Sequence, residues 1–114
     1  MNILVVDDEV TLRRTIRMAL ESTGHAVSEA GSQAQALQQV VLVRPDLVRL
    51  DLRLGRESGL DVLAALLAAV PGLGVILITA YASIDTAVEA MRRGALDYLA
   101  KPFTPKQLAD LIAR

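Results

Sequence analysis

Residues 46–50 read Asp-Leu-Val-Arg-Leu, a short and largely apolar run that is followed directly by the carboxylate of Asp51. Residues 3–6 and 75–78 are similar runs of aliphatic side chains. Near-continuous apolar runs of this length are typical of strands that are covered on both faces in a parallel sheet. Two further strands are expected, a weaker edge strand at residues 25–29 and a last strand at residues 96–100.

Amphipathic segments of helical length separate these strands. Apolar residues between 12 and 20, and again between 84 and 91, recur at the 3.6-residue spacing of one helical face. Gly24 and Gly94 stand where these two helices must end, the position at which a left-handed residue closes a helix at little cost. Three further helices are expected, at residues 34–43, at residues 60–70 and around Leu108, Leu111 and Ile112.

Five strand–helix units with short connections predict one right-handed, doubly wound α/β domain over residues 1–114. The expected architecture is a three-layer (βα)5 sandwich around a parallel five-stranded sheet, and the flavodoxin-like strand order 2-1-3-4-5 is the commonest solution for five strands. In such sheets ligands bind at the carboxyl ends of the strands near the switch point, which here means the first and third strands.

The composition excludes several classes of protein. A formal net charge of −1 leaves no basic field that would hold nucleic acid or an anionic membrane. The absence of cysteine excludes a disulfide framework, a thiolate zinc site and a cysteine nucleophile. The longest apolar stretch, residues 62–70, is about half as long as a bilayer crossing requires, and the N-terminus lacks the basic region of a secretory signal. We therefore expect a cytoplasmic domain.

Polar residues with complementary chemistry follow the expected strands. These are Asp7 and Asp8 after the first strand, Asp51 after the third, Thr79 after the fourth and Lys101 after the fifth. Carboxylates a few Å apart repel one another by roughly 4 kcal/mol per pair at an effective dielectric constant near 20, so the site needs either a cation or shifted protonation of a carboxyl group. Mg²⁺ is the natural candidate, because it takes hard oxygen ligands and commonly binds one or two carboxylates together with phosphate oxygens.

Four short motifs stand at these strand ends: Val5-Val6-Asp7-Asp8-Glu9, Leu50-Asp51, Ile78-Thr79-Ala80 and Tyr98-Leu99-Ala100-Lys101-Pro102-Phe103. Together and in this order they resemble the CheY-like receiver domain of bacterial two-component response regulators. The resemblance implies that Asp51 is the phosphoacceptor. It implies a Mg²⁺ site made of Asp7, Asp8, Asp51 and the backbone carbonyl of Arg53. It also implies that Thr79 and Lys101 contact the phosphoryl oxygens.

The resemblance further implies how such a domain signals. The one histidine of the chain, His25, lies in a turn before an edge strand and is not expected to be the phosphoryl donor. A separate sensor histidine kinase therefore supplies the phosphoryl group. Thr79 then moves toward the new phosphoryl group and Tyr98 swings inward, which repacks the surface of the fourth helix, fifth strand and fifth helix. The bulk of Arg53 and Tyr81 implies slow autodephosphorylation. Such a domain is no enzyme beyond its own phosphorylation and dephosphorylation.

The branch of the family is indicated by four segments. Residues 83–91 and 94–98 are similar to NtrC-like, sigma-54-dependent transcriptional activators, and residues 52–55 and 59–63 to the alginate-regulator subgroup. Those proteins carry a AAA+ ATPase and a DNA-binding domain after the receiver. We therefore expect output domains of this kind in the full-length protein, a fifth helix cut short at Arg114, and a homodimer through the fourth helix and fifth strand on activation.

Arg49 departs from the family's pattern, because it lies in the central strand where an apolar residue is usual. Burying a guanidinium without a partner costs several kcal/mol, so Arg49 should reach an acidic partner or the rim of the acidic site. Such a contact would alter the metal affinity or the reactivity of the acceptor.

Other interpretations of these residues stay open. Asp8 alone is also a good N-cap for the first helix, and Tyr98 is also explained as a half-buried aromatic residue with no switching role. A phosphorylation-independent docking module would keep the fold without the chemistry. A phosphohydrolase usually needs a second carboxylate where the chain has Arg53. A flavodoxin-type FMN binder needs a glycine- and hydroxyl-rich loop in place of residues 7–9.

Overall fold

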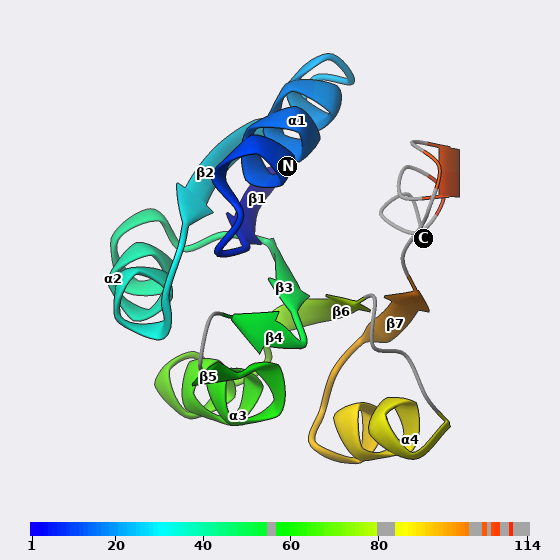
Figure 1. Ribbon diagram of the computed structural model, residues 1–114. Coiled ribbons are helices and arrows are strands. Elements are labelled where there is room, and N and C mark those ends of the chain that lie inside the picture. Colours follow the sequence, from blue (N-terminus) through cyan, green and yellow to red (C-terminus); the bar gives the residue numbers. More distant parts are fainter. Residues whose placement is uncertain (55–56, 80–83, 101–103, 105, 108–109, 111–114) are drawn as a thin grey trace.

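Five parallel strands form the central sheet of the chain, whose computed structural model describes residues 1–54, 57–79, 84–100, 104, 106, 107 and 110. The strands are β1 (Asn2–Val6), β2 (Ala26–Ala30), β3 (Leu47–Asp51), β6 (Gly74–Thr79) and β7 (Asp97–Ala100). Their order is β2-β1-β3-β6-β7, which is the predicted order 2-1-3-4-5 once the two short strands β4 and β5 are set aside (Figure 1). The predicted fold class is therefore confirmed.

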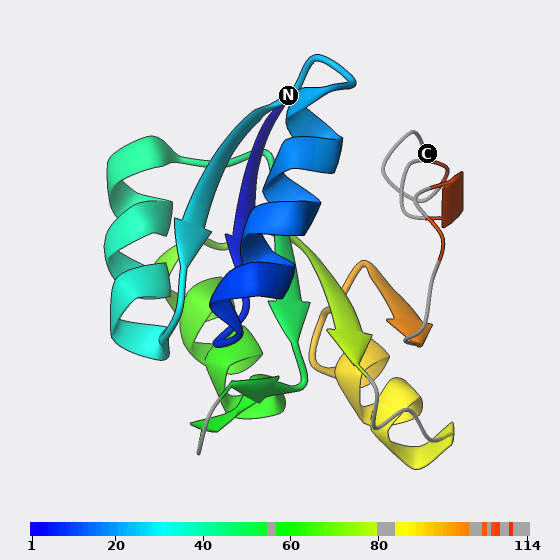
Figure 2. The same cartoon turned by 45° about the horizontal axis from the view of Figure 1, so that its top comes forward.

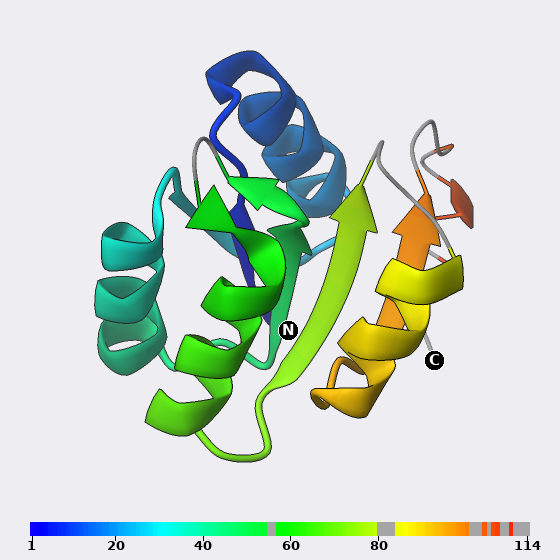
Figure 3. The same cartoon turned by 60° about the horizontal axis from the view of Figure 1, so that its bottom comes forward.

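Helices cover both faces of this sheet. They are α1 (Val10–Glu21), α2 (Gln33–Val43), α3 (Gly59–Ala69) and α4 (Ile84–Arg92). Figures 2 and 3 show α1 on one face, and α2, α3 and α4 on the other. A fifth helix is predicted around Leu108, Leu111 and Ile112. These three residues lie outside the described part of the chain.

Alternation along the buried strands divides the core into two clusters. Leu4, Val48 and Leu77 belong to the cluster under α2 and α3, whereas Val5 and Ile76 belong to the cluster under α1. Successive side chains of a strand point to opposite faces, so a strand covered on both sides must be apolar at nearly every position. This is the physical reason why the apolar runs of the sequence marked the strands correctly.

The ends of the helices follow the local sequence signals. Gly24 and Gly94 have φ angles of +90° and +103°, which confirms them as the left-handed residues that follow α1 and α4. The hydroxyl of Ser32 caps α2 by accepting a hydrogen bond from the backbone N–H of Gln35, at 3.2 Å. Arg44 ends α2 in the left-handed region, with a φ of 52°.

The structure differs from the sequence-based expectations in two places. A short antiparallel hairpin, β4 (Arg53–Leu54) with β5 (Glu57–Ser58), follows β3 and was not predicted, because strands of two residues leave no periodicity to detect. The N-cap of α1 is Glu9, so the interpretation of Asp8 as the cap of this helix is wrong. Element boundaries otherwise differ by one or two residues.

Within the described part of the chain, no helix is long and apolar enough to span a membrane.

Candidate functional site

Three buried polar residues lie at the carboxyl ends of adjacent strands. Asp7 is the first residue after β1, Asp51 is the last residue of β3, and Thr79 is the last residue of β6. Only 1%, 6% and 0% of their surfaces, respectively, are exposed. The register sets Asp51 opposite Ile78, so Thr79 lies one residue farther along the neighbouring strand. The fold therefore gathers two carboxylates and a hydroxyl at the edge where α/β sheets bind ligands.

Arg49 contacts this edge through a buried ion pair. It pairs in the sheet with Val5, whose side chain belongs to the α1 face. Because Arg49 lies two residues before Asp51, the side chains of Arg49 and Asp51 both belong to that face. Its Nη1 donates a 2.8 Å hydrogen bond to Oδ2 of Asp7, and both side chains are 1% exposed. The expectation that Arg49 reaches an acidic partner is confirmed, and that partner is one of the predicted metal ligands.

Asp7 is also held by three hydrogen bonds to other parts of the chain. Its Oδ1 accepts from the backbone N–H of Glu9 at 2.9 Å, and its own N–H donates to the carbonyl of Ala30 at 3.1 Å. Its carbonyl accepts from Nη1 of Arg13 at 2.8 Å. Both side-chain oxygens of Asp7 are thus engaged within the protein, and the orientation of the carboxylate is fixed.

A charged network between α1 and β2 supports Arg13. Glu29 accepts from Nε of Arg13 at 2.8 Å and from Nη1 of Arg17 at 2.9 Å. Burial raises the pKa of Glu29, but the hydrogen bonds from Arg17 and Arg13 outweigh it and leave the pKa below its ordinary value. Glu29 therefore carries its charge at neutral pH and positions Arg13 on the backbone of Asp7.

The remaining predicted site residues are less closely defined. Asp8 is exposed, and the backbone of Arg53 lies in β4. Lys101 and Tyr81 lie outside the described residues. Across residues 1–54, 57–79 and the other described positions, no group of three or more acidic or histidine side chains is arranged to hold a metal ion. One oxygen of Asp7 is occupied by Arg49.

Tyr98 links the edge strand to a helix. It is partly buried in β7, and its hydroxyl lies 3.0 Å from Oγ1 of Thr86 on α4, within hydrogen-bonding distance. Sequence reasoning singled out Tyr98 but missed Thr86, because the contact depends on how α4 packs on β7. The same region carries several exposed apolar side chains, namely Ile84, Val88, Met91 and Leu96.

Gly59 is a second residue that sequence reasoning did not assign to the site. It begins α3, and its N–H donates to the carbonyl of Leu52, the residue after Asp51. A Cβ atom at this position would lie 2.5 Å from Cα and 2.6 Å from the carbonyl oxygen of Leu52, and would also overlap the backbone of Asp51. Only glycine allows α3 to pack this closely against the end of β3.

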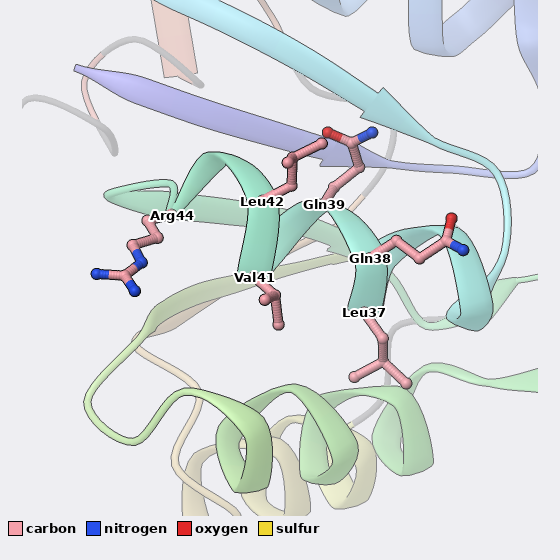
Figure 4. A pocket seen from close by; sticks show the side chains of 6 residues that line it. All are labelled: Leu37, Gln38, Gln39, Val41, Leu42 and Arg44. Carbon is pink, nitrogen blue, oxygen red and sulfur yellow. The ribbon is translucent and has the colours of Figure 1, made fainter.

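A pocket on α2 lies away from this edge. Figure 4 shows Leu37 and Val41 pointing from α2 toward α3. The pocket is lined by Leu37, Gln38, Gln39, Val41, Leu42 and Arg44. Arg44 is the one charged residue among these described lining residues, and the set contains no nucleophile or acid, so we assign the pocket no role in the chemistry.

Comparison with known proteins agrees with this geometry. The response regulator receiver domain family matches residues 3–113. The alginate biosynthesis transcriptional regulatory protein AlgB of Pseudomonas aeruginosa is 50% identical over 108 residues, a match that takes in 93% of this chain and 24% of AlgB. The chain thus spans about a quarter of the length of this relative.

Solved structures give the same result. The receiver domain of NtrX from Brucella abortus is 38% identical with a TM-score of 0.92, over 98% of this chain and 95% of that one. A response regulator from Burkholderia pseudomallei, which holds a phosphorylated aspartic acid, a calcium ion and citrate, is 36% identical with a TM-score of 0.90, over 96% of this chain and 65% of that one. The match along nearly the whole chain and these likenesses show that the chain belongs to the response regulator receiver domain family.

Proposed function

We propose that Asp51 is the phosphoacceptor of this receiver domain and takes its phosphoryl group from a sensor histidine kinase. The observation that carries the proposal is the placement of Asp51, a buried carboxylate at the carboxyl end of the central strand, beside Thr79 on the next strand. The phosphorylated aspartic acid of the Burkholderia relative supports it.

The proposed reaction is an in-line phosphoryl transfer. One carboxylate oxygen of Asp51 attacks phosphorus, and the new P–O bond forms as the bond from phosphorus to the kinase's histidine nitrogen breaks. The nitrogen keeps the electron pair, and the product is an acyl phosphate. Thr79 and Lys101 hold the phosphoryl oxygens by hydrogen bonding and charge. The bulk of Arg53 and Tyr81 restricts water, so autodephosphorylation is slow.

The chemistry of the donor set suits a Mg²⁺ ion, although the carboxylates among the described residues are not gathered around one point. Asp7, Asp8, Asp51 and the backbone carbonyl of Arg53 would hold it, all through hard oxygen atoms of the kind that Mg²⁺ prefers. When bound, the ion offsets negative charge on the phosphoryl oxygens. The calcium ion of the Burkholderia relative supports a divalent cation at this kind of site. Asp7 has to share or release its bond with Arg49 for this role.

The switch connects the acceptor to the face of α4 and β7. Thr79 moves toward the phosphoryl group, and Tyr98 turns inward, which breaks its hydrogen bond with Thr86. Phosphorylation shifts an existing equilibrium only by the difference in its interactions with the two states, so the hydrogen bond of Tyr98 helps to set the resting population. The exposed apolar residues of α4 suit a contact that changes on activation.

The full-length protein would carry output domains that respond to the receiver. A cytoplasmic chain with a AAA+ ATPase and a DNA-binding domain after the receiver would convert phosphorylation into sigma-54-dependent transcription, and the likeness to AlgB supports this output. Homodimerisation through α4 and β7 is the proposed step between phosphorylation and transcription. The receiver itself binds neither DNA nor a membrane.

The direct test is phosphorylation by a small-molecule donor. The chain is incubated with acetyl phosphate, with and without Mg²⁺, and its intact mass is measured. We expect one phosphoryl adduct that requires Mg²⁺, and none on Asp51→Asn. Asp46→Asn is the matched control, because Asp46 is an exposed carboxylate directly before the strand that ends in Asp51. An adduct on Asp51→Asn would refute the assignment.

A phosphorylation-independent docking module is the second candidate function. One observation favours it, the ion pair between Arg49 and Asp7 at a proposed metal ligand. A folded protein that binds Mg²⁺ but forms no adduct with acetyl phosphate or with any histidine kinase would support this alternative.

A further inference from the structure

Arg49 is the largest fully buried side chain among the described residues, and it lies in a strand that is otherwise apolar. Burying a charged pair rarely stabilises a fold more than well-packed apolar residues of the same volume do. Val5 and Ile76, its neighbours on the two adjacent strands, show that an aliphatic side chain would suit this position. The presence of a guanidinium therefore calls for a reason other than stability.

The guanidinium lies where a cation is needed. The site gathers negative charge at the carboxyl edge of the sheet, and Arg49 supplies a positive charge from within the same strand as Asp51. Its Nη1 lies 2.8 Å from Oδ2 of Asp7, while Oδ1 accepts from the N–H of Glu9. A divalent cation that binds Asp7 must either displace Arg49 from Oδ2 or approach a group of the same charge sign.

We infer that Arg49 is an internal counter-ion of the acidic site, which competes with the divalent cation for Asp7 and thereby sets the metal affinity of the receiver. This inference rests on the proposed function, because it assumes that Asp7 is a ligand of Mg²⁺. Arg49 acts here as a positioning residue. It balances the charge of Asp7 and holds the carboxylate in one orientation, and the cation binds by displacing Arg49 from Oδ2 or by sharing Asp7 with it.

The same contact links metal binding to the packing of the core. Arg13 and Ala30 fix the backbone of Asp7, and the N–H of Glu9 holds Oδ1, so the carboxylate has little freedom to turn away from Arg49. The movement therefore falls to the guanidinium, whose stem lies between β1 and β6 on the face covered by α1. Metal binding should perturb the side chain of Arg49 more than that of Arg13.

The test compares Mg²⁺ affinity across matched variants, with no phosphoryl donor present. Binding is measured by titration calorimetry and by the rise in unfolding temperature with Mg²⁺ concentration. Arg49→Met removes the counter-ion and keeps a long apolar side chain, whereas Arg49→Lys keeps the charge. Arg14→Met is the control, because Arg14 is an exposed residue of α1 and its loss changes the net charge by the same amount.

We expect Arg49→Met to bind Mg²⁺ at least about tenfold more tightly than the wild type, a difference of roughly 1.4 kcal/mol. Arg14→Met should stay within about twofold, and Arg49→Lys should remain close to the wild type. Equal or weaker binding by Arg49→Met would overturn the inference and would make Arg49 a support for the metal site. In that case a wild type that still takes a phosphoryl group with Mg²⁺ would leave the proposed function standing.

A measurement on the wild type keeps the inference testable if Arg49→Met does not fold. Nitrogen-detected NMR follows the guanidinium signals of Arg49 and Arg13 as Mg²⁺ is added. We expect the Arg49 signals to shift or exchange faster with solvent while those of Arg13 change little. Saturation with Mg²⁺ that leaves the Arg49 signals unchanged would overturn the inference.

Discussion

Substitution of Gly59 by alanine should damage the phosphoacceptor end of β3 from a residue that takes no part in the chemistry. The added Cβ would lie 2.5 Å from Cα and 2.6 Å from the carbonyl oxygen of Leu52, where ordinary contacts begin at 3.4 Å. Since these atoms belong to the backbone, no flexible side chain can give way. The end of β3 and the start of α3 must move apart by about 1 Å.

The expected loss of stability is about 2–4 kcal/mol. Overpacking of this kind costs about 1–3 kcal/mol, and separation of the two segments weakens the hydrogen bond from Gly59 to Leu52, which contributes about 1 kcal/mol. The higher helix propensity of alanine offsets little, because Gly59 is the first residue of α3. Unfolding in urea measures the loss, and the rate of adduct formation with acetyl phosphate should fall in parallel.

Gly72→Ala is the control for this prediction. Gly72 has a φ of +85°, and no atom lies within 4 Å of the place where a Cβ would stand, so alanine there meets backbone strain without overlap. Its cost should be about 1–2 kcal/mol, with no effect on phosphorylation. A Gly59→Ala protein whose free energy of unfolding lies within about 0.5 kcal/mol of the wild type would contradict this prediction, because it would mean that the two segments separate freely.

Three further predictions concern other parts of the molecule. Glu29→Gln should lower stability at neutral pH by about 1–3 kcal/mol and flatten its pH dependence, measured by urea unfolding. Because the pKa of Glu29 is lowered in the folded state, its contribution to the free energy of unfolding is present above its ordinary pKa of 4.5 and is lost as the pH falls through the folded-state pKa. A variant whose stability falls with acid just as that of the wild type does would contradict this. Arg44→Gly should raise the free energy of unfolding by up to about 1 kcal/mol, because glycine adopts a φ of 52° without strain; a loss would contradict it. Thr86→Val should shift Tyr98 toward its inward position without phosphorylation, because the hydroxyl of Tyr98 loses this partner; aromatic NMR signals of Tyr98 that stay unchanged in the variant would contradict it.

The fold was predictable because its sheet is buried on both faces. Each central strand needs an apolar residue at almost every position, so the strands appear in the sequence as uninterrupted runs. Glycines with positive φ then mark where helices end. The hairpin of β4 and β5 left no such signal, since two residues per strand are too few for a pattern and its pairing depends on the turn between them.

The site was only partly predictable, for a different reason. The strand ends could be located from the strands, so the buried positions of Asp7, Asp51 and Thr79 follow from topology alone. The need of Arg49 for an acidic partner also followed, from the cost of burying its charge. The choice of Asp7 over another carboxylate did not follow, because it depends on the register of β1 against β3. The contact of Tyr98 with Thr86 likewise depends on packing.

The identity of the acceptor is tested most directly by chemical mapping. The chain is treated with acetyl phosphate and Mg²⁺, the acyl phosphate is reduced with borohydride to the corresponding alcohol, and the modified residue is located by peptide mass spectrometry. We expect that Asp51 is converted and that Asp7, Asp8 and Asp46 are not. A modified residue other than Asp51, or no modification in a folded protein that binds Mg²⁺, would contradict it.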